Sequence, residues 1–191
     1  MSDHQAGGRP APARPEFSRM VHLADLARND LTTTWTATGA ECAALAKRYR
    51  VLAVHALSAQ VSVSAIGGGG ALAEIAFTAD VEQHSVVSLE AVRQTVSDTV
   101  TVRYLPEAKV AAYEALLEEE GDATPEEDIE AIDGESIDIG ETIAQQLSLA
   151  LDPYPRQAGE KFEDYWDSSD GDGPPEGRNP FGILKNLKQD S

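Results

Sequence analysis

The residue types that could do chemistry are few in this sequence, and their spacing does not build a catalytic or metal centre. His4, His22, His55 and His84 stand apart from one another and from Cys42, the single cysteine. A zinc site needs pairs of such ligands a few residues apart, and a serine nucleophile elbow needs a Gly-x-Ser-x-Gly segment, which is missing. We therefore expect Cys42 to be a small buried side chain and His55 to be a structural histidine in a strand.

Two segments resemble ligand-binding loops but lack the residues that would complete them. Residues 67–70 are four glycines, and a phosphate loop would need Lys and Ser or Thr next, where Ala71 and Leu72 stand. In the Asp-rich run that starts at Asp167, Arg178 occupies the twelfth position, where a calcium loop requires a bidentate Glu. We predict a non-enzymatic protein with no cofactor and no metal. A small acidic hydrolase is the last alternative, because a carboxylate pair could assemble in the fold.

The net charge is −18, and most of it comes from one segment. Residues 110 to 155 contain no Lys or Arg and fourteen Asp or Glu. Such a segment repels phosphate backbones and favours a basic protein partner. The simpler interpretation is a charged loop that keeps the molecule soluble. On the first interpretation the candidate partner-binding acids are Glu118, Glu119 and Glu120, and DNA is not an expected partner.

The alternative function, direct binding to RNA, has sparse cationic candidates. Lys47, Arg48 and Arg50 lie together at the end of a predicted helix, whereas Arg93 and Arg103 lie on predicted strands. Nucleic-acid binding needs clustered cations. A group such as Lys47 to Arg50 is typical of a solvated helix end.

Periodicity predicts an α+β fold, an antiparallel β-sheet or meander packed with two or three helices. Apolar residues at every second position predict strands, and Ala-rich or four-residue spacing predicts helices. The glycines at 67–70 predict a hairpin turn. The region 16–26 is expected to be extended; the strands are 31–37, 51–66, 71–81, 85–92 and 95–104, and the helices 40–50, 107–120 and 136–151.

We predict one domain with tails. Residues 1–15 form a disordered tail, 16–156 the domain with an acidic mobile linker at 121–135, and 157–177 a flexible linker. Residues 178–191 are expected to hold a short docking helix, with Asn179 as N-cap and Pro180 in the first turn. A helix this short is unstable alone, so its apolar side chains must pack on its own domain or on another molecule. The candidate contacts are Asn179, Pro180, Phe181, Leu184, Leu187 and Lys188.

No apolar run approaches the ~20 residues that a membrane span requires. The N-terminal segment has no apolar stretch typical of a secretory signal, and the lone cysteine is typical of a reducing compartment. We therefore expect a cytoplasmic protein without a membrane partner.

Three stretches, in order, resemble the YceD family of large ribosomal RNA subunit accumulation proteins. Residues 85–92 (SVVSLEAV) are similar to its central "C-V-V-T-L-E-P-V" segment. Residues 137–151 (IDIGETIAQQLSLAL) are similar to its "I-D-L" helix, and residues 179–188 (NPFGILKNLK) to its closing "N-P-F-A-x-L-x-x-L-K". The likeness covers the chain from about residue 17 to residue 188.

The resemblance implies a bacterial ribosome biogenesis factor needed for 23S rRNA accumulation and large ribosomal subunit assembly. The partners that it implies are a large-subunit precursor, a basic ribosomal protein (bL32 is the candidate, because its gene often neighbours the family's) or 23S rRNA itself. Many relatives carry cysteine near the central segment, where this chain has His84 and Ser85, so no thiol or metal role carries over. Ala91 also replaces the family's usual proline.

Overall fold

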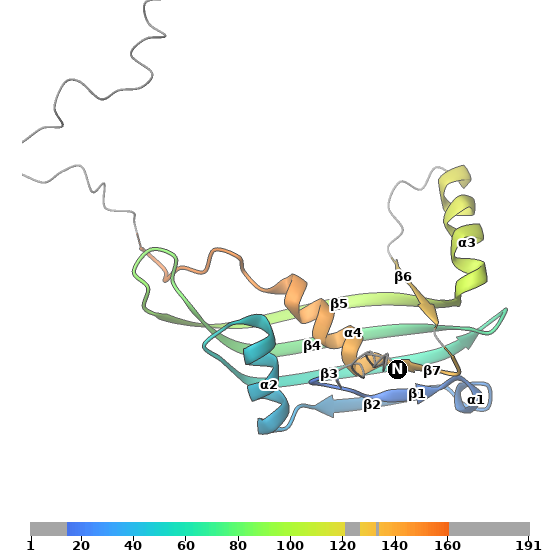
Figure 1. The fold of residues 1–191 in the computed structure, drawn as a ribbon, viewed down its shortest axis with the longest axis horizontal. Coiled ribbons are helices and arrows are strands. Elements are labelled where there is room, and N and C mark those ends of the chain that lie inside the picture. The colour runs from blue at the N-terminus through green and yellow to red at the C-terminus, as the bar shows by residue number, and fades with distance from the viewer. Residues whose placement is uncertain (1–14, 121–126, 133, 161–191) are drawn as a thin grey trace, which may run out of the picture. The chain divides into compact units, whose positions relative to one another are not determined.

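The computed structural model describes residues 15–120, 127–132 and 134–160, and Figure 1 shows how their elements are arranged. The elements are, in chain order, β1 (Met20–His22), α1 (Leu23–Leu26), β2 (Leu31–Thr36), α2 (Gly39–Tyr49), β3 (Ala53–Ile66), β4 (Gly70–His84), β5 (Ala91–Pro106), α3 (Glu107–Glu120), β6 (Glu127–Ile132), β7 (Ser136–Asp138) and α4 (Ile139–Ala150).

A five-stranded sheet in the order β2-β3-β4-β5-β6 organises these elements. Its first four strands are antiparallel, and β6 adds in parallel to β5. A second sheet joins β1 and β7, which come from opposite ends of the described chain. The β3–β4 hairpin turns at Gly68 and Gly69, whose φ angles are +84° and +81°. Residues that have a side chain rarely adopt such backbone angles, which is why glycines occupy this turn.

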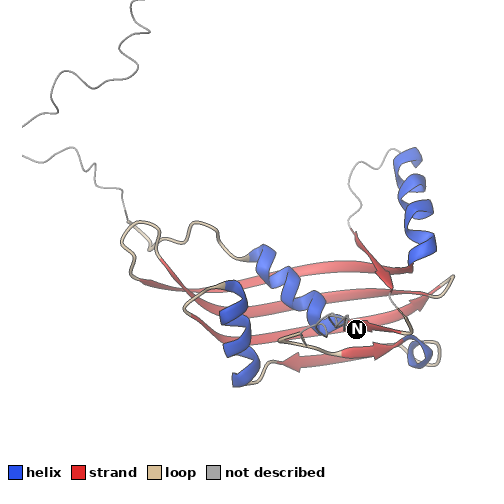
Figure 2. Ribbon diagram, in the orientation of Figure 1, coloured by secondary structure: helices blue, strands red, loops and turns tan. Residues whose placement is uncertain are grey.

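One face of the five-stranded sheet is covered and the other is open, as Figure 2 shows. The alternation in β3 and β4 sends apolar side chains such as Val61, Ile75 and Phe77 to the covered face. There they pack with Leu45 of α2 and Ile143 of α4. The open face carries mainly Ser, Thr and Gln. Burial of a Leu, Ile or Phe side chain contributes about 1.5–3 kcal/mol, so the pattern of the strands determines which face the helices cover.

The start of α4 packs directly against the N-terminal segment of the domain. Asp138 is its N-cap and accepts hydrogen bonds from the backbone N–H groups of Gly140 and Glu141. It also accepts one from Ser18 Oγ (2.6 Å) and one from Arg19 N–H (2.7 Å). A Cβ on Gly140 would lie 2.6 Å from the Arg19 backbone nitrogen, so only glycine allows this approach.

The capping of α2 is tied to the same N-terminal segment. Thr38 and Glu41 form a capping box, in which each side chain binds the backbone N–H of the other residue. The Glu41 carboxylate also accepts hydrogen bonds from the Arg19 guanidinium, the shorter at 2.7 Å. Arg19 therefore connects the N-cap of α2 to the segment that packs on α4.

The predicted α+β fold with an antiparallel sheet is confirmed, and so are the helices expected at 40–50 and 107–120. The helix expected at 136–151 is confirmed for Ile139–Ala150, whereas Ser136–Asp138 form the strand β7. The expected strand at 85–92 is wrong for residues 85–90, which form a turn. The hydroxyl of Ser85 accepts the N–H groups of Val87 and Ser88, and such local bonds compete with a strand ladder. β5 begins at Ala91 and includes the expected strand at 95–104.

The linker expected at 121–135 is wrong for Glu127–Ile132, which form β6, because pairing with β5 satisfies the backbone of a segment whose acidic composition suggests a loop. The extended segment expected at 16–26 holds β1 but ends in the single turn of α1. Residues 157–160 of the expected second linker are described. The tail 1–14, the rest of that linker and the segment 178–191 lie outside the described residues.

We predict that Gly140→Ala destabilises the fold, because the added Cβ would overlap the backbone of residues 17–19. The expected loss in free energy of unfolding is about 1–3 kcal/mol, measured by chemical denaturation. Gly39→Ala is the matched control, since a Cβ there meets nothing within 4 Å, and should leave stability unchanged or raise it by up to about 1 kcal/mol. Equal effects of the two substitutions would contradict the close approach.

The hydrogen bond from Arg19 lowers the pKa of Glu41 from 4.5 to about 2. A carboxyl whose pKa is lower in the folded state stabilises the fold above its unfolded pKa, and this contribution is lost as the pH falls towards the folded value. We expect the free energy of unfolding to decline between pH 4.5 and about 2, and to decline less in Glu41→Gln. Glu74→Gln, at an exposed site of β4, is the control; an equal change of slope in both variants would rule out this role of Glu41.

Candidate interaction surface

The carboxylates of α3 and β6 gather along one edge of the five-stranded sheet. We call Glu107, Glu114, Glu127, Asp128 and Glu130 the acidic edge; the first two lie on α3 and the others on β6. β6 is the terminal strand of the sheet and α3 contacts it (Figure 1). Sequence separates these residues by an undescribed segment, but the parallel pairing of β6 with β5 places them together. Five described carboxylates therefore belong to two elements in contact, whose described residues include one cation, Lys109.

Two cations lie beside the acidic edge, and both have partners. Arg103 Nε donates to Glu127 at 2.7 Å, and its guanidinium lies over the Tyr113 ring at 5.1 Å from the centroid. Lys109 Nζ donates to the Gly68 carbonyl at 2.9 Å. The acidic edge therefore has five described carboxylates and two neighbouring cations, and one of these cations, Arg103, is already paired with a carboxylate.

Glu130 is half-buried and belongs to a hydrogen-bonded cluster. Its carboxylate accepts from Thr142 Oγ1 at 3.5 Å, and Thr142 in turn shares a 2.7 Å bond with the Tyr104 hydroxyl. Burial raises the pKa of Glu130, and the carboxylates of Asp128 and Glu141 add to the effect. Within the described ranges, no three His, Cys, Asp or Glu side chains gather in a way that could hold a metal ion.

The structure places most of the candidate RNA-binding cations in ion pairs. Arg48 makes two bonds to Glu141, at 2.7 and 2.8 Å, and one to Glu16 at 3.0 Å. Arg93 pairs with Asp80 across β4 and β5. Arg103, as described above, pairs with Glu127. Because these ion pairs neutralise their charges, the three arginines would attract a phosphate less strongly.

Lys47 and Arg50 are exposed at the end of α2. Arg50 has a φ of +58° and caps this helix in the left-handed conformation. These two residues remain as the accessible positive charges of the predicted RNA-binding group. Two separate cations are fewer than the stripe or patch that nucleic-acid binding normally uses.

The other partner-binding candidates are only partly visible. Glu118, Glu119 and Glu120 are the last residues of α3, and their side chains are outside the described part. Residues 179–188 also lie outside it. Cys42 is buried, as expected, and burial raises the pKa of its thiol. His55 bonds Glu82 at 2.8 Å, in keeping with a structural role.

The turn at residues 85–90 has a hydrogen-bonded polar interior. Ser85 is fully buried, and its hydroxyl donates to the Glu160 carboxylate, which also accepts from Ser88 Oγ. Those bonds lower the pKa of Glu160. Leu89 has a φ of +62° and is 72% exposed. Ser85 thus anchors a turn, and the turn presents an apolar side chain, Leu89, to solvent.

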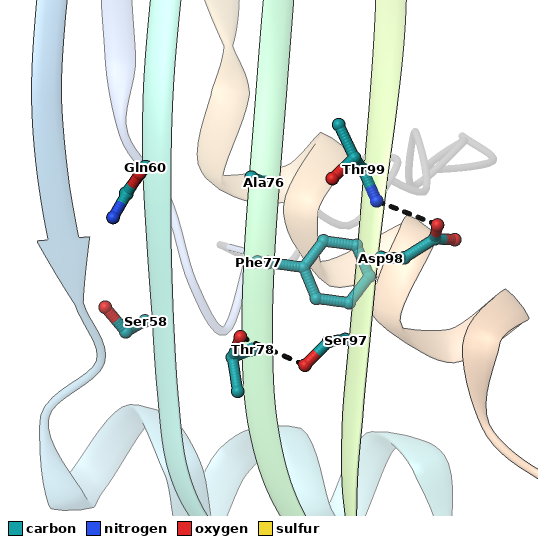
Figure 3. A pocket seen from close by; sticks show the side chains of 8 residues that line it. All are labelled: Ser58, Gln60, Ala76, Phe77, Thr78, Ser97, Asp98 and Thr99. Carbon is teal, nitrogen blue, oxygen red and sulfur yellow. Dashed lines mark hydrogen bonds between the residues drawn. The ribbon is translucent and has the colours of Figure 1, made fainter.

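The open face of the sheet is hollowed along its centre. Figure 3 shows the strands in front of the helices, with the hydroxyls of Ser58, Thr78 and Ser97 on three neighbouring strands. A hollow of about 540 Å³ here adjoins another of about 600 Å³ that shares Gln60, Ala76 and Thr99 with it. Short polar side chains can hydrogen-bond a ligand. The described lining offers no histidine or cysteine to activate a nucleophile.

A family model described as "Large ribosomal RNA subunit accumulation protein YceD" matches residues 73–188. The chain belongs to this family, and so to a class of proteins named for accumulation of the large ribosomal RNA subunit rather than for an enzymatic activity. A search of curated proteins and a search of solved structures found no match. In the described part of the chain, no helix is both long and apolar enough to cross a membrane.

Several residues that shape these surfaces are not among those expected from the sequence. The Thr38-x-x-Glu41 and Asp138-x-x-Glu141 spacings are capping signals that can be read from sequence. The partners of Glu141 and Glu160, which are Arg48 and Ser85, lie far away along the chain and have no local signal. β6 was missed because its acidic composition outweighs its two isoleucines.

We predict that Arg48 has a structural role. Arg48→Ala would leave the part-buried carboxylates of Glu16 and Glu141 without their partner, so the free energy of unfolding should fall by about 1.5–3 kcal/mol. Lys47→Ala, at the exposed neighbour, should change it by less than about 0.5 kcal/mol. Thermal and chemical denaturation measure both values. If Arg48→Ala leaves the free energy of unfolding unchanged, Arg48 is again a candidate for binding RNA.

Proposed function

We propose that this protein is a non-enzymatic ribosome biogenesis factor that supports 23S rRNA accumulation by binding a basic ribosomal protein, or a basic surface of the nascent large subunit, at its acidic edge. The protein bL32 is the candidate partner. Membership of the YceD family supports the setting in large-subunit accumulation. The nature of the partner is our inference from charge.

The observation that carries this proposal is that arginines and carboxylates differ in how often they are paired. Arg48, Arg93 and Arg103 each have a carboxylate partner, whereas most carboxylates of the acidic edge have no cation within ion-pair distance in the described part. Among the described residues, the unpaired charge of the acidic edge is therefore negative. A surface of one sign raises the association rate of an oppositely charged partner by about 10 to 10³-fold, and the effect weakens as salt is added.

Basic ribosomal proteins need such a partner for a physical reason. Their positive charge binds RNA without sequence preference, because phosphate contacts supply most non-specific affinity. A carboxylate surface that covers the positive charge until the correct rRNA site is formed would lower this non-specific binding. The role requires no chemical step and fits a site that has carboxylates and no activated nucleophile.

The test is complementation of a strain that lacks the protein, with 23S rRNA measured against 16S rRNA. We expect Glu107→Gln, Glu114→Gln and Asp128→Asn together, or Glu118→Gln, Glu119→Gln and Glu120→Gln together, to restore 23S rRNA less well than the wild type. The matched control changes the same amount of charge elsewhere, with Asp25→Asn, Glu74→Gln and Asp98→Asn. It should restore 23S rRNA fully.

Binding of purified bL32 gives a second measurement, because attraction between opposite charges should weaken through screening as the salt concentration is raised from about 50 to about 200 mM. Full complementation by both acidic-edge variants, or bL32 binding that is insensitive to salt, would refute the proposal. Loss of complementation in Lys47→Glu with Arg50→Glu alone would instead favour direct contact with rRNA.

A further inference from the structure

The two edges of the five-stranded sheet are built differently. β6, at one edge, carries three carboxylates in six residues. β2, at the other edge, reads LTTTWT and has no charged residue, no proline and no break in its register with β3. Natural proteins usually protect an edge strand with charges, proline or a bulge, because its free N–H and C=O groups can pair with another strand. β2 has none of these protections.

The backbone groups that β2 offers can be assigned from two hydrogen bonds. Ala37 N–H, directly after the strand, bonds the Leu57 carbonyl of β3 at 2.9 Å. The Thr36 carbonyl points the other way, where Arg19 approaches it at 3.5 Å. Since the N–H and C=O of a residue in an antiparallel strand share one side, and sides alternate, Thr32 and Thr34 direct their backbone groups outward. Both residues are exposed.

We infer that β2 pairs antiparallel with β2 of a second copy of this chain, with Thr33 on the two-fold axis. In this register Thr32 lies opposite Thr34 of the other copy, and each such pair exchanges two hydrogen bonds, so the outward N–H and C=O groups of Thr32 and Thr34 are satisfied in both copies. Leu31 lies opposite Trp35 on the covered face, and aromatic–aliphatic cross-strand pairs stabilise a sheet. The two sheets become one of ten strands.

The groove beside β2 adds apolar surface to this contact. Leu31 and Trp35 line a hollow of about 560 Å³ together with Met20, which is 55% exposed. These three side chains lie on the covered-face side of the edge, where Leu31 and Trp35 of the second copy would arrive. Pairing of the strands would therefore bury apolar surface as well as satisfy backbone groups.

The distribution of charge permits self-association of a chain with net charge −18. The acidic edge is four strand spacings from β2, about 19 Å. In the pair of copies the two acidic edges would be nine spacings apart, about 43 Å. The Debye length at physiological salt is about 8 Å, so their mutual repulsion is screened. The interface leaves both acidic edges exposed, and this inference does not depend on the proposed function.

The test measures the mass of the full chain by sedimentation velocity at a series of concentrations up to about 100 µM. The wild type should reach twice the chain mass of 20.4 kDa. In T32E/T34E, carboxylates face carboxylates across the two-fold axis, so this variant should be monomeric. In T32K/T34E each cation faces a carboxylate of the other copy, so dimerisation should return. Both side chains are exposed, and circular dichroism checks that each variant is folded.

A cross-link tests the register directly. Thr33 faces its own copy in a pair without hydrogen bonds, where Cα atoms lie about 4.5 Å apart, within disulfide range. Thr33→Cys should form a dimer under mild oxidation, and Thr99→Cys, exposed on β5 away from the edge, should not; both are made with Cys42→Ala. A monomeric wild type at about 100 µM, a dimeric T32E/T34E, or a monomeric T32K/T34E would each overturn the inference.

Discussion

The fold depends on the contact between the start of α4 and residues 17–19. Gly140 lies so close to this segment that a Cβ would overlap its backbone, and Asp138 accepts bonds from Ser18 and Arg19 while it caps the helix. The contact joins residues 120 positions apart and is continued by the pairing of β1 with β7. It holds α4 over β4 and β5 and so closes the core. Substitution of Gly140 or Asp138 would disturb both the cap of α4 and the packing on the covered face.

This contact also determines which charges are left for a partner. Arg19 and Arg48 pair with Glu41, Glu16 and Glu141 around it, so these carboxylates and arginines act in folding. The carboxylates of α3 and β6 take little part in such pairs and form the acidic edge. The family match begins at residue 73, yet Arg19 and Arg48 precede it. Asp138 and Glu141, which lie inside the matched range, therefore have hydrogen-bond partners outside it.

The sheet separates two kinds of edge because its strand order places β2 and β6 at opposite ends. The β6 edge is protected by charge and can attract a cationic partner. The β2 edge is neutral and exposes backbone groups, which suits pairing with an identical strand. The hollow on the open face lies between them and is lined by short polar side chains. The character of each edge depends on which strand is terminal in the sheet. The order of residues along the chain does not contain that information.

The sequence by itself determined the class of fold and most of its elements. Alternation in β3 and β4 predicts strands with one buried face, the glycines at 67–70 predict their turn, and the stripe through Ile139, Ile143 and Leu147 predicts α4. These are local signals, because side-chain period and turn geometry depend on neighbours along the chain. The concentration of acid in one segment, and the likeness to the YceD family, could also be read from it.

The tertiary structure decided everything that depends on residues far apart. The acidic stretch at 127–132 is a strand because β5 satisfies its backbone in parallel, and residues 85–90 are a turn because Ser85 bonds locally and to Glu160. Arg48, Arg93 and Arg103 are candidate RNA contacts in the sequence and ion-pair partners in the fold. Their carboxylates lie 13 or more positions away. Long-range pairing of charges and strands leaves no periodicity in the chain, so only the folded arrangement reveals it.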